Sequence, residues 1–109
     1  MSYKVITIRA FDKQAKRLLK KYPSLKTELI ELATVLKNNP VLGTELGNNC
    51  YKIRIGIASK GKGKSGGARV ISHFYVLDDT VILLSIYDKS EQANISDKQI
   101  ITLLKQIDQ

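Results

Sequence analysis

The part of this chain best suited to chemistry on an anion lies between Lys52 and Ser72, where every charged side chain is a cation. Such side chains neutralise phosphate oxygens, and an arginine can stabilise the extra negative charge that develops on a phosphate during cleavage. The cations of this segment are Lys52, Arg54, Lys60, Lys62, Lys64 and Arg69. Their types and spacing indicate a surface for a polyanion.

The segment Tyr51–Ala58 reads as a strand with one cationic face. Successive side chains of a strand point to opposite faces of its sheet. Lys52 and Arg54 therefore share one face. The other face is apolar and comprises Tyr51, Ile53, Ile55 and Ile57.

Two further predicted strands, Ala68–Leu77 and Val81–Tyr87, extend this face. We assign to the core Val70 and Phe74 of the first, and Ile82, Leu84 and Ile86 of the second. Alternation then places on the opposite face Arg69, Ile71, His73, Ser85 and Tyr87, with Lys89 just beyond. The side chains predicted to converge on one surface are Lys52, Arg54, Arg69, Tyr87 and Lys89.

This surface could bind an RNA backbone and stabilise a phosphorane-like transition state. Arg54, Arg69, Tyr87 and Lys89 are the candidate catalytic residues, and Lys52 is a candidate for RNA binding. Tyr87 could stack on a base or join proton transfer. The alternative for Tyr87 is a half-buried aromatic of the sheet surface.

Between the first two of these strands lies a loop with Lys60, Lys62 and Lys64 among four glycines. Glycines let a backbone approach a ligand closely, and lysines neutralise phosphates as point charges. The loop therefore reads as a flexible basic clamp on RNA. A solvated loop whose lysines only confer solubility is the alternative.

The remaining reactive side chains receive simpler interpretations. His73 is a lone histidine on a strand, and we expect it to be structural rather than catalytic. Cys50, the single cysteine, is expected to be buried and inert. Asp88 and Glu91 could orient a cation near the site, but we favour loop carboxylates in water. Without a histidine pair or a carboxylate pattern, we expect no metal and no cofactor.

Bulk composition narrows the class of partner. The chain has 109 residues, a formal net charge of +8 and a pI near 9.7. That length predicts one domain over residues 1–109 with a single modest core. The charge favours nucleic acid, an acidic protein or an anionic membrane surface. We expect a cytoplasmic protein with no membrane association, since no apolar stretch approaches a bilayer span and no secretion signal is recognisable.

The N-terminal half reads as a strand followed by two helices. The strand covers Tyr3–Arg9, and the first helix runs from about Asp12 to Tyr22 with lysines and an arginine on its outer face. Ser24 opens a second helix, which ends at Asn38-Asn39-Pro40 because proline disfavours helix at the preceding residue. Segment 41–49 is expected to be a connecting loop because it is rich in glycine and asparagine.

The C-terminal half adds the three strands and a last helix. Asp78-Asp79 is predicted to join the last two strands as a tight hairpin. A polar loop covers 88–94, and Ser96 then opens a helix with capping-box spacing to Gln99. The order β-α-α-β-β-β-α predicts an α+β fold, a small mainly antiparallel sheet with the N-terminal helical hairpin on one face and a C-terminal helix. The opposite face is expected to be at least partly open.

The segments NNPVLGTELGNN, YKIRIGIASKGKGKSGGARVI and LLSIYDKSEQANIS together resemble the RelE/ParE superfamily of toxins from bacterial toxin–antitoxin modules. The chain looks most like the HigB-type members of the RelE branch. The resemblance spans nearly the full length, and SKGKGKSGGARVI and IYDKSE are its specific parts. It implies a RelE-like fold.

The resemblance implies a metal-independent endoribonuclease that cuts mRNA, usually on the translating ribosome, and that a cognate antitoxin protein neutralises. In such toxins the ribose 2′-oxygen attacks the adjacent phosphate. By motif, the basic pair of the first central strand falls on Lys52 and Arg54, the arginine of the next strand on Arg69, and the last positions on Tyr87 and Lys89. A tyrosine near the C-terminus, used by some RelE-like members, has no equivalent in 95–109.

Two other functions remain open at this stage. A ParE-like inhibitor of DNA gyrase would use the same fold without cleaving RNA. A catalytically inactive RNA-binding module is the other. The cations Arg54, Arg69 and Lys89 on one face favour the ribonuclease, because an inhibitor has no need of a charge-stabilising site.

Overall fold

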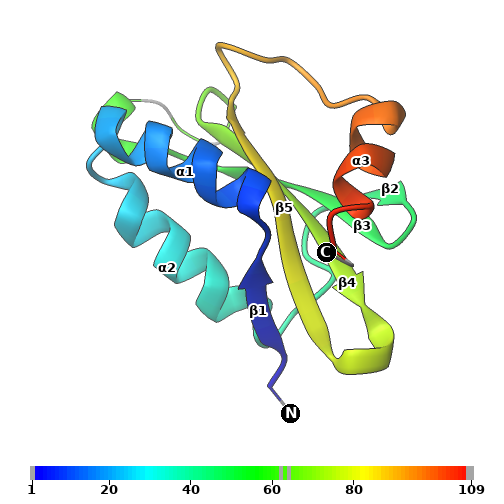
Figure 1. Ribbon diagram of the computed structural model, residues 1–109. Coiled ribbons are helices and arrows are strands. Elements are labelled where there is room, and N and C mark those ends of the chain that lie inside the picture. Colours follow the sequence, from blue (N-terminus) through cyan, green and yellow to red (C-terminus); the bar gives the residue numbers. More distant parts are fainter. Residues whose placement is uncertain (1, 62, 64, 108–109) are drawn as a thin grey trace.

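The computed structural model describes residues 2–61, 63 and 65–107. Over these residues the chain forms a five-stranded sheet with three α-helices (Figure 1). The elements in chain order are β1 Lys4–Thr7, α1 Arg9–Lys21, α2 Leu25–Leu36, β2 Thr44–Gly47, β3 Cys50–Ile55, β4 Ala68–Tyr75, β5 Thr80–Asp88 and α3 Asp97–Leu104. Lys62 and Lys64, two of the predicted RNA-binding lysines, lie outside the described residues.

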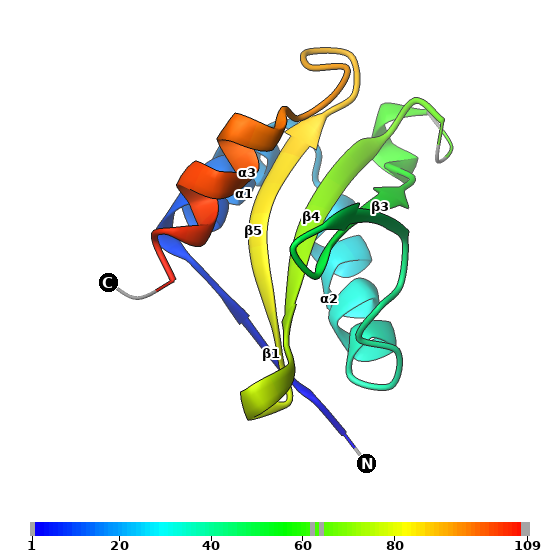
Figure 2. The same cartoon turned by 90° about the vertical axis from the view of Figure 1, so that its right-hand side faces the viewer.

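The strands follow the spatial order β1-β5-β4-β3-β2. Strand β1 pairs with β5 in parallel, and the other neighbours are antiparallel. Helices α1 and α2 cover one face of the sheet and α3 lies on the other (Figure 1). Figure 2 looks onto the α3 side, with α2 behind the strands. The predicted α+β class and mainly antiparallel sheet are confirmed, and α3 covers part of the face expected to be open.

The prediction of a loop over 41–49 was wrong for β2, an edge strand that pairs antiparallel with β3. Asn48 and Asn49 join the two strands, and both have positive φ, of 53° and 56°. Two consecutive left-handed residues are the signature of a type I′ hairpin turn, which asparagine tolerates better than most residues. The paired asparagines were therefore a hairpin signal.

Two other boundaries differ from the sequence prediction. Helix α1 begins at Arg9, three residues before the expected Asp12, because Phe11 already packs into the core from the first helical turn. The β4–β5 connection is longer than the predicted Asp78-Asp79 hairpin. A short 3-10 helix occupies Val76–Asp78, and Asp79 follows with a φ of 48°.

A β-bulge in β5 changes the face assignment that alternation predicted. Ile71 of β4 opposes Ser85, but Ser72 opposes Leu83, so Leu84 is an extra residue on β5. An inserted residue reverses the alternation beyond it. Our assignment of Ile82, Leu84 and Ile86 to one core face was therefore wrong, since Ile86 packs on the helical-hairpin side while the other two pack against α3.

The sheet consequently separates two apolar clusters. One lies between the sheet and the helical hairpin and includes Phe11, Leu18, Leu36 and Val70. The other lies between the sheet and α3 and includes Ile71, Leu84, Tyr87 and Ile100. For β3 and β4 the predicted alternation is confirmed, with Ile53, Ile55, Val70 and Phe74 on the hairpin side.

Helix α3 begins as the sequence predicts. Ser96 Oγ accepts a hydrogen bond from the Gln99 N–H at 3.1 Å, and Gln99 Oε1 accepts one from the Ser96 N–H at 2.9 Å. This capping box satisfies two donors that the first helical turn leaves free. None of the described helices combines the length and the apolar character needed to cross a bilayer.

Candidate active site

Strand register brings three of the four predicted catalytic residues side by side. Arg54 of β3 lies directly opposite Arg69 of β4, and Arg69 lies opposite Tyr87 of β5. Directly opposed residues of antiparallel strands have Cβ atoms roughly 4.5–5.5 Å apart and project to the same face. We call Arg54, Arg69 and Tyr87 the cross-strand row. It lies on the sheet face that α3 partly covers.

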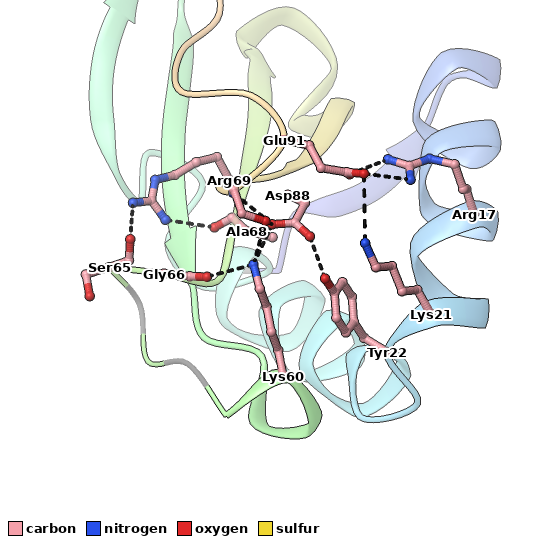
Figure 3. Close-up of polar contacts among 11 residues, drawn as sticks. Arg17, Lys21, Tyr22, Lys60, Ser65, Gly66, Ala68, Arg69, Asp88 and Glu91 are labelled. Carbon is pink, nitrogen blue, oxygen red and sulfur yellow. Dashed lines mark hydrogen bonds and ion pairs between the residues drawn. The ribbon is translucent and has the colours of Figure 1, made fainter.

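Arg69 is the buried centre of this row, with 4 % of its surface exposed. Its guanidinium donates hydrogen bonds to the Ala68 carbonyl oxygen at 3.1 Å and to the Ser65 carbonyl oxygen at 3.3 Å (Figure 3). These acceptors belong to the end of the glycine-rich loop and the start of β4. The loop backbone therefore helps to orient the guanidinium.

Tyr87 is buried as well, with 4 % exposed. Among the described residues its hydroxyl has no hydrogen-bond partner. Burial raises the pKa of the Tyr87 phenol, and the nearby Arg69 charge opposes that shift only in part. The phenol is therefore protonated at neutral pH and can act as a hydrogen-bond or proton donor. Contact with RNA, whether by stacking or by proton transfer, would require this side chain to become exposed.

The other cations of this face are more accessible. Arg54 is exposed, and Lys52, two residues earlier on β3, is half-buried. Lys89 follows β5, where its N–H donates to the Gly67 carbonyl oxygen at 3.0 Å and its Nζ to the Ala93 carbonyl oxygen at 3.2 Å. Within the described part of the chain none of these three forms an ion pair.

Lys60 behaves differently from the flexible loop lysine that the sequence suggested. It belongs to a short 3-10 helix, Ala58–Lys60, and its side chain is only 13 % exposed. Its Nζ donates to Asp88 Oδ1 at 2.5 Å, to the Gly66 carbonyl oxygen at 3.0 Å and to Ser90 Oγ at 3.1 Å (Figure 3). The ammonium thus binds groups of the protein itself.

Asp88 is fully buried, so the favoured interpretation of a loop carboxylate in water was wrong. It also accepts hydrogen bonds from the Tyr22 hydroxyl at 2.6 Å and from the Ser90 N–H and Oγ at 2.9 and 2.7 Å. Burial alone would raise the pKa of Asp88, but the bonds from Lys60, Tyr22 and Ser90 outweigh it and hold that pKa well below its usual range. The carboxylate is therefore ionised.

Glu91 lies nearby but in a different environment. Its carboxylate is exposed and pairs with Arg17 at 2.7 Å and Lys21 at 3.9 Å, both from α1 (Figure 3). The hydrogen bond and charge of Arg17 lower the pKa of Glu91. Glu91 is thus solvated, as expected, but it also connects the loop after β5 to α1.

The match to a known family covers almost the whole chain. The model of the RelE toxin of the RelE/RelB toxin–antitoxin system matches residues 3–108. The chain belongs to the RelE toxin family. Among solved structures, a mutant of E. coli toxin RelE in the free state superposes with a TM-score of 0.64 at 16 % sequence identity, covering 98 % of this chain and 99 % of that chain. At that identity the likeness establishes the shared RelE fold.

Two side chains of this RelE-family chain lie away from the cross-strand row. His73 is four residues along β4 from Arg69, roughly 13 Å at the usual rise of a strand. Its Nδ1 lies 3.6 Å from the Cys50 Sγ. Burial raises the pKa of the Cys50 thiol to about 11 and lowers the pKa of His73, so this pair is a neutral thiol beside a neutral imidazole. Cys50 is buried, as predicted.

The sequence did not predict the network that Tyr22, Lys60 and Ser90 form around the buried Asp88 carboxylate. Tyr22 had been predicted as the end of the first helix, and Lys60 as a contact to RNA. One signal was present in the sequence. Asp88 directly ends the apolar run of β5, where a carboxylate that remains in the sheet becomes buried and needs a partner.

Proposed function

We propose that this RelE-family toxin is a metal-independent endoribonuclease that cleaves mRNA on the translating ribosome. The observation that carries the proposal is the cross-strand row, which aligns two arginines with a protonated tyrosine on adjacent strands. Arginines stabilise the charge of a pentacoordinate phosphate, and a positioned phenol can deliver a proton to a leaving oxygen. A protein that only binds a partner has no need of this arrangement.

The reaction proposed for this row is an internal transesterification. The ribose 2′-oxygen attacks the adjacent phosphorus while the bond from phosphorus to the 5′-oxygen breaks, which leaves a 2′,3′-cyclic phosphate and a 5′-hydroxyl. The proton of the 2′-hydroxyl passes to solvent, and the Tyr87 phenol supplies the proton of the leaving oxygen. Arg69, assisted by Arg54 and Lys89, stabilises the added charge on the phosphate.

RNA binding in this proposal rests on accessible cations. Lys52 adjoins the row on the same strand, and Lys62 and Lys64 remain predicted phosphate contacts of the glycine-rich loop. Each phosphate that a cation neutralises releases counterions, so binding should weaken steeply with salt. Lys60 is left out of this set because Asp88, Gly66 and Ser90 already occupy its ammonium.

A toxin of this family implies a cognate antitoxin as partner. The net charge of +8 suits an acidic antitoxin as well as ribosomal RNA. We further propose action in the cytoplasm, where ribosomes translate mRNA. The finer assignment to HigB-type members stays a prediction.

Mapping of mRNA 5′ ends after brief induction tests the proposed function. Wild type should create new ends within translated codons, and Arg69→Ala should reduce their yield by about 10²–10³-fold, the usual effect of removing one transition-state donor. Arg9→Ala, an exposed arginine of α1 away from the row, is the matched control and should cleave normally. Far-ultraviolet circular dichroism checks that each variant is folded.

Two results would count against the ribonuclease. Full cleavage by a folded Arg69→Ala protein would remove Arg69 from the chemistry. Arrested growth with intact mRNA would reject RNA cleavage altogether. Gyrase supercoiling would then be the next measurement, because a ParE-like inhibitor would block it.

A further inference from the structure

The Asp88 carboxylate is the centre of a network on the sheet face opposite the cross-strand row. Asp88 lies across from Ala68 in the β4–β5 register, one residue from the Arg69–Tyr87 pair. Alternation sends these neighbours to opposite faces, so the network lies behind the row. Tyr22, its donor from the chain segment after α1, belongs to the apolar cluster under the helical hairpin.

A buried carboxylate needs this many donors to remain ionised. Removing a carboxylate from water is costly unless charge and hydrogen bonds are replaced inside the protein. Asp88 receives bonds from Tyr22, Lys60 and Ser90, and no part of its surface is exposed. A carboxylate with this many hydrogen bonds has one low-energy arrangement. Tyr22, Lys60 and Ser90 are therefore held in place together with Asp88.

Lys60 links three chain segments through one ammonium. It comes from the start of the glycine-rich loop, and it bonds to Gly66 at the loop's end, to Asp88 at the end of β5 and to Ser90 just beyond that strand. A lysine used in this way closes the loop at its base. Its bonds therefore limit how Lys60 and Gly66 can move relative to the end of β5.

The segments closed by Lys60 are those that carry the catalytic candidates. The Arg69 guanidinium donates to the carbonyl oxygens of Ser65 and Ala68, on either side of the Gly66 that Lys60 holds. Lys89 follows Asp88 directly, and its N–H bonds to Gly67. Gly67 packs closely against the β3 backbone, since a Cβ there would lie 2.1 Å from the Ile55 carbonyl oxygen.

We propose that Lys60 is a positioning residue, which through Asp88 and Gly66 holds the loop end and the β5 end so that Arg69 and Lys89 meet the scissile phosphate. This inference rests on the proposed ribonuclease function. In this inference Lys60 differs from the loop's other lysines, because it affects the rate of the chemical step and not the affinity for RNA.

The decisive experiment compares Lys60→Met with wild type in steady-state cleavage of mRNA on purified, programmed ribosomes. Methionine keeps the aliphatic stem and removes the ammonium. We expect kcat to fall at least 10-fold, KM to change less than 2-fold, and the salt dependence of ribosome binding to stay as in wild type. Lys26→Met, an exposed lysine at the start of α2, is the matched control and should leave all three unchanged.

Opposite results would overturn the inference. If Lys60 contacts a phosphate, the slope of log K against log salt should fall by about 0.7, with raised KM and unchanged kcat. If the network supports only the fold, kcat should stay unchanged in the folded fraction of Lys60→Met. Tyr22→Phe removes one donor to Asp88 and keeps Lys60, so it should lower kcat by 2- to 5-fold even if Lys60→Met folds poorly.

A readout independent of activity separates this inference from the proposed function. The Lys89 N–H, bonded to Gly67, should exchange with solvent at least 10-fold faster in Lys60→Met than in wild type, while the Ile100 N–H in α3 should not change. Wild type that cleaves no mRNA would reject the ribonuclease. Unchanged Lys89 exchange would reject positioning by Lys60, whether or not the protein cleaves RNA.

Discussion

The two faces of the sheet near the end of β5 differ in whether their charged side chains are paired. On the helical-hairpin side, the buried Asp88 carboxylate is matched by the Lys60 ammonium and the Tyr22 hydroxyl. On the α3 side, Lys52, Arg54 and Lys89 form no ion pair within the described residues. Compensated charge holds backbone segments together, whereas cations without a carboxylate keep their attraction for a phosphate.

Two buried tyrosines show the same contrast. The Tyr22 hydroxyl donates to an ionised carboxylate at 2.6 Å, while the Tyr87 hydroxyl has no partner among the described residues. A buried polar group without a hydrogen-bond partner lowers the stability of the fold. Proteins retain such a group where function needs it. In the proposed function, the two tyrosines buried near the same end of the sheet serve stability on one face and chemistry on the other.

Asp88→Asn is expected to cause the largest loss of stability. Asparagine keeps the shape but removes the charge that Lys60 needs, so the free energy of unfolding should fall by about 3 kcal/mol, as when one partner of a buried pair is lost. Urea unfolding measures this. Glu91→Gln is the matched control, since Glu91 is also paired with cations but is exposed, and its variant should unfold at the wild-type midpoint.

Acid should reproduce part of that loss in the wild type. The pKa of Asp88 is lower in the folded than in the unfolded chain, where it lies near its ordinary value of about 3.9. The stabilisation is therefore present above that value and is lost progressively as the pH falls toward the folded-state pKa. Urea midpoints from pH 7 to pH 3 should decline more steeply in wild type than in Asp88→Asn. Parallel declines would contradict the assignment.

Replacing the two tyrosines should sharpen the contrast between the faces. Tyr87→Phe should reduce ribosome-dependent cleavage by about 10²-fold, the lower range for loss of a general acid. It should not lower stability, because the hydroxyl removed has no partner. Tyr22→Phe loses a hydrogen bond to a charged group and should cost about 2 kcal/mol of unfolding free energy. A Tyr87→Phe protein with full activity would remove the phenol from the mechanism.

The smallest effect concerns the helix that covers the α3 side. Ser96→Ala removes the hydroxyl of the capping box and should cost about 1 kcal/mol. Thr34→Ala on α2 is the control, because its exposed hydroxyl bonds to the Ile30 carbonyl oxygen of the same helix and adds little. Thermal unfolding compares the two. Equal losses would mean that α3 depends on the packing of Ile100 rather than on its cap.

Local patterns predicted much of the fold. The helical hairpin, strands β1, β3, β4 and β5, and the Ser96 cap follow from periodicity and capping chemistry, which act over a few residues. The pattern failed at β2, where a four-residue edge strand carries too few residues to show alternation. It failed again at the Leu84 bulge, because an inserted residue is defined by the register of the partner strand and not by its own sequence.

Strand alternation and residue type are local properties, so the sequence alone was enough to predict the class of fold, the excess of cations and the residues that occupy the row. Arg54, Arg69 and Tyr87 could be chosen without knowing that they face one another. The partners of Lys60 and Asp88, in contrast, could not be predicted without the folded chain. These two residues are 28 positions apart, and their contact depends on β4–β5 pairing and on the packing of Tyr22, which bury the carboxylate and thereby select the lysine.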